Sequence, residues 1–112
     1  MIPHGVQIFM ALEPIDMRWS FDRLSGIALD SLGYDACSGA LFMFCGKRKT
    51  AMKILFFDGT GMCIFYKRLD KGQIRLTTAH DPSARHVELS DAELESLLDG
   101  IELERKSVPR IH

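Results

Sequence analysis

The chain has 112 residues, a formal net charge of −1, 46% hydrophobic residues and 26% charged residues. This composition predicts one globular domain over residues 1–112 and excludes a disordered chain. No apolar run reaches the roughly 18 residues that a membrane-spanning helix needs. The first residues also lack the basic and apolar segments of a signal peptide. We therefore expect a cytoplasmic protein without membrane contact.

The N-terminal third carries a strand pattern followed by a helix pattern. Apolar residues alternate over residues 6–12 and predict a first strand, which ends before Pro14. Apolar residues then recur at helical spacing and predict a helix over about residues 20–32. Gly33 suits the end of this helix, because glycine readily adopts the left-handed conformation of a helix C-terminus.

The centre of the chain contains three apolar runs, at residues 40–45, 52–57 and 62–68. Each run is apolar on both faces, which predicts strands that lie inside a sheet and are covered by helices on at least one side. Short turns that contain glycine separate the runs and predict a meander of antiparallel neighbours. A shorter fourth strand is predicted at residues 73–77.

The C-terminal helix has the clearest start signal in the chain. Ser90 is followed three residues later by Glu93, which is the pattern of a capping box. It predicts a helix over residues 91–99, preceded by a polar loop at 80–86. The charged tail at 104–112 is expected to fray.

Consecutive strands between two helices predict an α+β fold. We expect an antiparallel sheet of four to five strands, built from a meander over residues 40–77 and the N-terminal strand at 6–12. The two helices are expected at about 20–32 and 91–99.

The near-zero net charge conceals a strong segregation of charge along the chain. Residues 1–46 carry five acids and two bases, whereas residues 47–75 carry eight bases and two acids. Residues 80–104 carry eight acids and one base. Such asymmetry is informative about binding partners, although a solvated surface of mixed charge is the alternative.

Geometry predicts that the bases of the middle segment converge. In an antiparallel meander, the first and third connections lie at the same end of the sheet. We therefore expect a cluster of positive charge at one rim, suited to nucleic-acid phosphates and without a helix that could read a groove. The expected nucleic-acid-binding residues are Lys47, Arg48, Lys49, Lys53, Lys67, Arg68 and Lys71.

The carboxylates, histidines and cysteines do not form a recognisable catalytic or metal site. Asp16, Asp22 and Asp58 belong to a helix start, a helix face and a turn, so we do not expect them to form a metal triad. No nucleophile motif, phosphate loop or dinucleotide motif is present. The three cysteines lack close-pair spacing and are expected to be free thiols in a reducing compartment. We expect no enzyme activity, no metal and no cofactor.

Arg18 and Trp19, at the entry to the first helix, are candidate partner-docking residues. Tryptophan and arginine are enriched where proteins bind one another. The alternative is that Trp19 lies at the edge of the hydrophobic core.

Several motifs resemble those of a small accessory protein, TnpB, of the IS sixty-six type of bacterial insertion sequence, which is distinct from the RNA-guided nuclease of the same name. The motifs are Met1-Ile2-Pro3, Asp16-Met17-Arg18, Phe21-Asp22, Asp58-Gly59-Thr60-Gly61, Lys67-Arg68-Leu69, Lys71-Gly72, and Leu97-Leu98-Asp99-Gly100-Ile101. The chain departs from the family in Phe56-Phe57 and in Ile74-Arg75-Leu76-Thr77, where the family often has tryptophan.

The resemblance implies a non-catalytic helper of DNA transposition, encoded beside a separate transposase. It implies the DNA of the element and the cognate transposase as partners, and it carries over no catalytic residues. Three hypotheses follow: a nucleic-acid-binding accessory module, a protein-interaction subunit of the transposase complex without DNA contact, and a small metal-dependent nuclease. The first fits the bases at residues 47–71, the second fits the acidic segment at 80–104, and the scattered carboxylates oppose the third.

Overall fold

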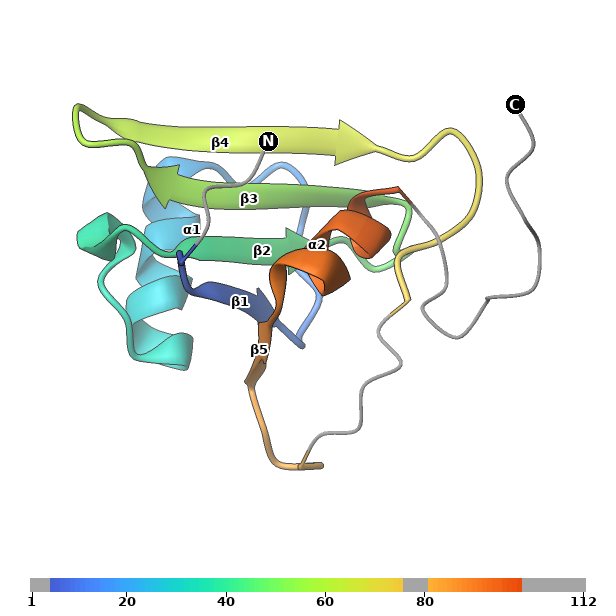
Figure 1. Cartoon of the computed structure of the whole chain (residues 1–112), viewed down its shortest axis with the longest axis horizontal. Helices are drawn as coiled ribbons and strands as arrows, with labels where there is room; N and C mark the ends of the chain where they lie inside the picture. Colours follow the sequence, from blue (N-terminus) through green and yellow to red (C-terminus); the bar gives the residue numbers. More distant parts are fainter. Residues whose placement is uncertain (1–4, 76–80, 100–112) are drawn as a thin grey trace.

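A five-stranded sheet forms the centre of the molecule, with strand order β4-β3-β2-β1-β5 (Figure 1). The computed structural model describes residues 5–75 and 81–99. The sheet and its helices confirm the predicted α+β class. The strands are β1 (Ile8–Ala11), β2 (Leu41–Cys45), β3 (Ala51–Phe57), β4 (Met62–Arg68) and β5 (His86–Leu89).

The sheet is antiparallel except between β1 and β2, which are parallel with Ile8 opposite Leu41. Parallel neighbours need a crossover connection, and here it contains helix α1 (Phe21–Ile27). This helix continues as a wider π-helical turn, η1 (Ala28–Leu32), and ends at Gly33 with a φ of 81°. A short 3₁₀ turn, η2 (Ala36–Ser38), then leads into β2. The helix at 20–32 is therefore confirmed.

The last strand of the sheet lies at a different place in the chain from the strand predicted at residues 73–77. Residues 73–75 form an irregular segment and not the predicted strand, and residues 76–77 lie outside the described residues. Instead β5 pairs antiparallel with the free edge of β1, with Leu89 opposite Ile8. Ile74 anchors this irregular segment, because its side chain is 2% exposed whereas Gln73 and Arg75 are exposed.

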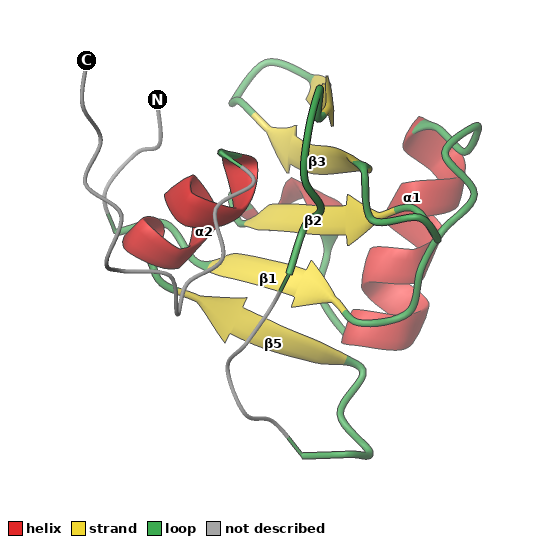
Figure 2. Cartoon of the chain, turned by 90° about the vertical axis from the view of Figure 1, so that its right-hand side faces the viewer, coloured by secondary structure: helices red, strands yellow, loops and turns green. Residues whose placement is uncertain are grey.

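Helices cover both faces of the sheet, which explains why the central strands are apolar on both sides. Figure 2 shows α1 on one side of the sheet and α2 (Asp91–Leu98) on the other. The α1 side buries Leu24 against Phe42 and Phe44 of β2. The α2 side buries Leu94 and Leu97 against the opposite face of the same strand. Strand β2 is therefore buried on both faces.

The start of α2 has the predicted capping box. The Ser90 hydroxyl accepts a hydrogen bond from the Glu93 main-chain N–H, at 3.1 Å. The Glu93 carboxylate in turn accepts one from the Ser90 main-chain N–H, at 2.8 Å. The predicted tail at 104–112 lies outside the described residues.

The three cysteines are free thiols, with Cys45 buried and Cys37 exposed. Within residues 5–75 and 81–99, no helix combines the length and the apolar character that crossing a membrane requires.

Candidate nucleic-acid interface

The turn between β2 and β3 presents three adjacent bases to solvent. It closes through a hydrogen bond of 3.0 Å from the Lys49 N–H to the Gly46 carbonyl. Gly46 packs closely on Met17, since a Cβ atom at this position would lie 2.9 Å from Cγ of Met17 and would force that side chain to move. Lys49 then adopts a left-handed conformation, with a φ of 59°. Lys47, Arg48 and Lys49 are all exposed.

The segment after β4 is hydrogen-bonded directly to this turn. The Leu69 N–H donates to the Thr50 carbonyl and the Ile74 N–H donates to the Lys49 carbonyl, each at 2.7 Å. The Gln73 side-chain amide also donates to the Arg48 carbonyl, at 3.0 Å. The first and third connections of the meander therefore lie side by side, as the strand order predicts.

These contacts bring bases from both connections to the same end of the sheet. Strand β4 ends with Lys67 opposite Met52 and Arg68 opposite Ala51, and the following segment contains Lys71. We call this group the basic rim; its residues are Lys47, Arg48, Lys49, Lys67, Arg68 and Lys71.

Lys53, the seventh expected member, does not belong to this surface. It lies inside β3 and is only 8% exposed. Its ammonium group donates a hydrogen bond of 2.7 Å to the Trp19 carbonyl and lies 5.2 Å from the centre of the Tyr66 ring. Lys53 therefore ties the entry of α1 to the sheet and lies apart from the basic rim.

Two acids accompany the basic rim. Asp70 lies in the segment after β4 and is exposed. Asp16 faces a hollow of about 470 Å³ that Lys47, Arg48 and Lys49 also line. Hydrogen bonds from Arg18 hold the pKa of Asp16 well below its usual range, and Lys47 lowers it further. Asp16 is therefore ionised and partly offsets the charge of the neighbouring lysine.

The candidate docking residues Arg18 and Trp19 have different surroundings. The Arg18 guanidinium is bound by both carboxylate oxygens of Asp16, at 3.0 and 2.6 Å. The Trp19 ring is half-buried beside the α1-side core and is stacked under the guanidinium of Arg23, 4.2 Å from the ring centre. The four-residue spacing does not predict this stacking, because Trp19 precedes the N-cap Ser20 and lies outside the helix.

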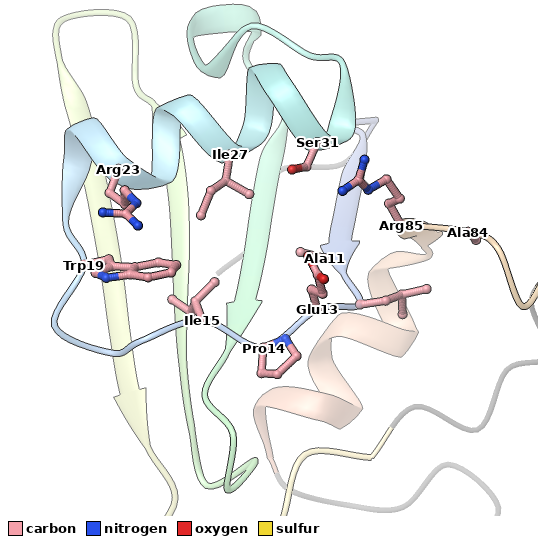
Figure 3. A pocket seen from close by; sticks show the side chains of 11 residues that line it. Ala11, Glu13, Pro14, Ile15, Trp19, Arg23, Ile27, Ser31, Ala84 and Arg85 are labelled. Atoms are coloured by element: carbon pink, nitrogen blue, oxygen red, sulfur yellow. The ribbon is translucent and has the colours of Figure 1, made fainter.

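Trp19 also forms one end of a second hollow, of about 430 Å³ (Figure 3). The floor contains Ile15 and Ile27, and Arg85 stands at the opposite end from Trp19. The hollow thus has apolar side chains in its middle and a guanidinium group at each end, and Glu13 and Ser31 add a carboxylate and a hydroxyl to its lining. This arrangement suits an apolar side chain of a protein better than a nucleic-acid backbone.

The carboxylates are accounted for by local hydrogen bonds. Asp58 accepts from the Thr60 N–H, the Thr60 hydroxyl and the Gly61 N–H, at 2.8 to 2.9 Å. These bonds lower the pKa of Asp58 to about 2. Asp58 lies in the turn at the opposite end of β3 from the basic rim. Among the described residues, no group of three or more His, Cys, Asp or Glu side chains could hold a metal ion.

Comparison with known proteins identifies the family. The family described as IS66 Orf2 like protein matches residues 6–108, which is most of the chain. The chain belongs to the IS66 Orf2-like family. This membership confirms the resemblance inferred from the motifs, and it makes the chain an accessory protein associated with transposition.

Two curated relatives from Sinorhizobium fredii support the family assignment. The uncharacterized protein y4hO is 34% identical over 104 residues, which cover 91% of this chain and 88% of the relative. The uncharacterized protein y4jC is 28% identical over 109 residues, which cover 95% and 91%. No solved structure matches this IS66 Orf2-like chain.

Proposed function

We propose that this IS66 Orf2-like protein contacts the phosphates of nucleic acid through the basic rim and so assists a transposase that carries out the strand chemistry. The observation that carries the proposal is the pair of 2.7 Å main-chain hydrogen bonds between the segment after β4 and the β2–β3 turn. They fix two loops that bear bases against each other. The main chain that carries these bases is therefore held in place before nucleic acid binds.

Pre-positioning matters because each phosphate contact must offset the entropy lost when a long side chain is ordered. The backbone of both loops is already held by hydrogen bonds, so binding orders only the side chains. Arg48 and Arg68 contribute guanidinium groups, which match phosphate oxygens in a two-pronged geometry. The binding energy should be mainly electrostatic and should decrease steeply with salt.

The rim is built from loops and a strand end, and it offers no helix to enter a groove. Phosphate contacts position a protein on nucleic acid but carry no sequence information directly. We therefore infer that the chain binds element DNA and unrelated DNA with similar affinity, and that the transposase selects the element ends.

A mobility-shift experiment tests this proposal. The purified chain is mixed with element-end DNA and with unrelated DNA of equal length, each with and without the cognate transposase. We expect the chain alone to shift both DNAs at low salt. Nucleic-acid contact would be contradicted by two results together: the chain alone shifts neither DNA, and adding the chain to transposase and DNA produces no shift beyond that of transposase alone.

The second candidate function is docking on the transposase without direct DNA contact. The observation that favours it is the hollow between Trp19 and Arg85, because it combines a tryptophan with two arginines, and these residue types are enriched where proteins bind one another. Loss of transposase binding in a Trp19→Ala protein that still shifts DNA would support this function. A complex that Trp19→Ala leaves intact would exclude this hollow as the contact.

We also propose that the chain catalyses no nucleic-acid chemistry by itself. The local hydrogen bonds of Asp16 and Asp58 support this. The test is incubation with supercoiled and single-stranded DNA in the presence of magnesium or manganese, and we expect no cleavage. Cleavage that disappears in Asp16→Asn or Asp58→Asn protein would reverse this conclusion.

A further inference from the structure

Strand β4 forms one outer edge of the sheet, and this edge has no partner among the described residues. β4 pairs with β3 over its whole length, from Phe57 opposite Met62 to Ala51 opposite Arg68. In Figure 1 it is the top strand, and no described segment runs along its outer side. An exposed strand edge is a template for pairing with another strand.

The register of the β3–β4 ladder shows which groups face outward. Hydrogen bonds from Asp58 to Gly61 and from Leu69 to Thr50 mark hydrogen-bonded pairs at the two ends of the ladder. In an antiparallel ladder such pairs alternate with pairs that are not hydrogen-bonded. The main-chain N–H and C=O groups that point away from β3 therefore belong to Met62, Ile64, Tyr66 and Arg68.

The middle of this edge is apolar and exposed. Phe65 is 46% exposed and Tyr66 is 49% exposed, on opposite faces of the sheet. Natural edge strands are usually protected by charges, proline or bulges, whereas residues 63–66 contain none of these. The charges of β4, Lys67 and Arg68, stand only at its end. The exposed apolar centre of β4 makes this edge suited to pairing with another strand.

We propose that a second copy of this chain pairs with β4 along this edge, antiparallel and around a two-fold axis at Phe65. In this register Ile64 lies opposite the partner's Tyr66, and Met62 lies opposite the partner's Arg68. Every outward-facing main-chain group of the strand then has a hydrogen-bonding partner. A shift of the register by two residues would leave some of these groups unpaired at the ends of the strand.

The side chains fit this self-pairing as well. Phe65 lies beside the partner's Phe65 at a position without hydrogen bonds, where cross-strand side chains approach most closely. Tyr66 lies beside the partner's Ile64, an aromatic and β-branched pair of the kind that stabilises sheets. Both exposed aromatic side chains of β4 lose contact with water on pairing.

Charge complementarity favours a second copy over an unrelated strand. An antiparallel two-fold arrangement places the basic end of one β4 beside the opposite end of the other. That opposite end leads into the hairpin turn at residues 58–61, which contains the ionised Asp58 and no base. Arg68 of each chain therefore approaches the acidic turn of its partner, and the like charges of the two basic rims lie at opposite ends of the joined sheet.

Sedimentation equilibrium on the full chain tests the proposal. We expect wild type to dimerise and Phe65→Lys to raise the dimer dissociation constant by more than about tenfold, because the axis would bring two ammonium groups together. The matched control is Leu29→Lys, in the η1 turn, because Leu29 is 59% exposed and lies outside the sheet. Circular dichroism checks that both variants are folded.

Cross-linking tests the register and does not depend on the folding of the lysine variant. In a background with Cys37→Ser and Cys63→Ser, we expect Phe65→Cys to form a covalent dimer on mild oxidation, whereas Leu29→Cys stays monomeric. A monomeric wild type, or a dimer that neither weakens in Phe65→Lys nor cross-links in Phe65→Cys, would overturn the proposal. A monomer that binds the transposase in a Phe65-dependent manner would assign the edge to that protein and would also overturn self-pairing.

Discussion

The main-chain carbonyl of Lys49 accepts a hydrogen bond of 2.7 Å from the main-chain N–H of Ile74. Lys49 is an exposed member of the basic rim, whereas the Ile74 side chain is buried in the core on the α2 side. Ile74 therefore anchors the segment after β4 in the core through its side chain. Through its main-chain N–H it also holds the turn that carries three bases. The position of the charge depends on the packing beneath it.

Ile74→Ala tests this dependence. The substitution leaves a cavity under the segment, and we expect the free energy of unfolding to fall by about 2–4 kcal/mol. DNA affinity at low salt should fall too, because the segment after β4 loses its anchor in the core and is held less firmly against the β2–β3 turn. Chemical denaturation and fluorescence anisotropy measure the two effects.

The control for this prediction is Gln73→Ala. It removes an exposed hydrogen bond to Arg48 and should cost less than about 1 kcal/mol of stability. If Ile74→Ala lowered the free energy of unfolding by less than about 1 kcal/mol, Ile74 would not anchor the segment.

The sequence predicted the local elements well, because their signals are local. The runs at 40–45, 52–57 and 62–68 match β2, β3 and β4 within one residue, and the capping box gave the start of α2. The meander also placed the two basic connections at one end of the sheet, since that placement depends only on neighbouring antiparallel strands.

The missed features depend on contacts between distant parts of the chain. Strand β5 has only four residues, so its sequence pattern is a weak signal. It is a strand because it pairs with the edge of β1. The parallel pairing of β1 and β2 follows from the crossover through α1, which a run of consecutive strands does not indicate. The burial of Lys53 could have been inferred, because Lys53 stands between Met52 and Ile54 in a strand expected to be covered.

Lys53→Met should separate stability from nucleic-acid binding. Methionine fills most of the same volume but cannot donate to the Trp19 carbonyl, so we expect a loss of about 1–3 kcal/mol in the free energy of unfolding. Lys53 lies outside the basic rim, so the salt dependence of DNA binding should be unchanged. A smaller salt dependence in folded Lys53→Met protein would return Lys53 to the interface.

Asp58 should make the stability of the protein depend on pH in acid. Hydrogen bonds from Thr60 and Gly61 lower its folded pKa from 3.8 to about 2. The ionised carboxylate therefore contributes its stabilisation fully above pH 3.8, and this contribution is lost as the pH falls through about 2. In Asp58→Asn protein, which cannot ionise there, the contribution is absent at every pH.

Thermal unfolding across this pH range measures the effect. The Tm difference between wild type and Asp58→Asn should be largest near neutral pH and should shrink as the pH falls from 3.8 towards about 2. Asp22→Asn, on the exposed start of α1, is the control for the change in net charge. A difference that stays constant with pH would contradict the role assigned to the Asp58 turn.

The salt dependence of DNA binding tests the basic rim most directly. We compare wild type with Arg48→Gln/Arg68→Gln protein by fluorescence anisotropy over a range of salt concentrations, with Arg85→Gln as a control that removes a base outside the rim. If both arginines contact phosphates, the slope of log K against log salt should become shallower by about 1.8 in the double variant and stay unchanged in the control. Equal slopes in all three proteins, or no binding by wild type at low salt, would contradict nucleic-acid contact through the basic rim.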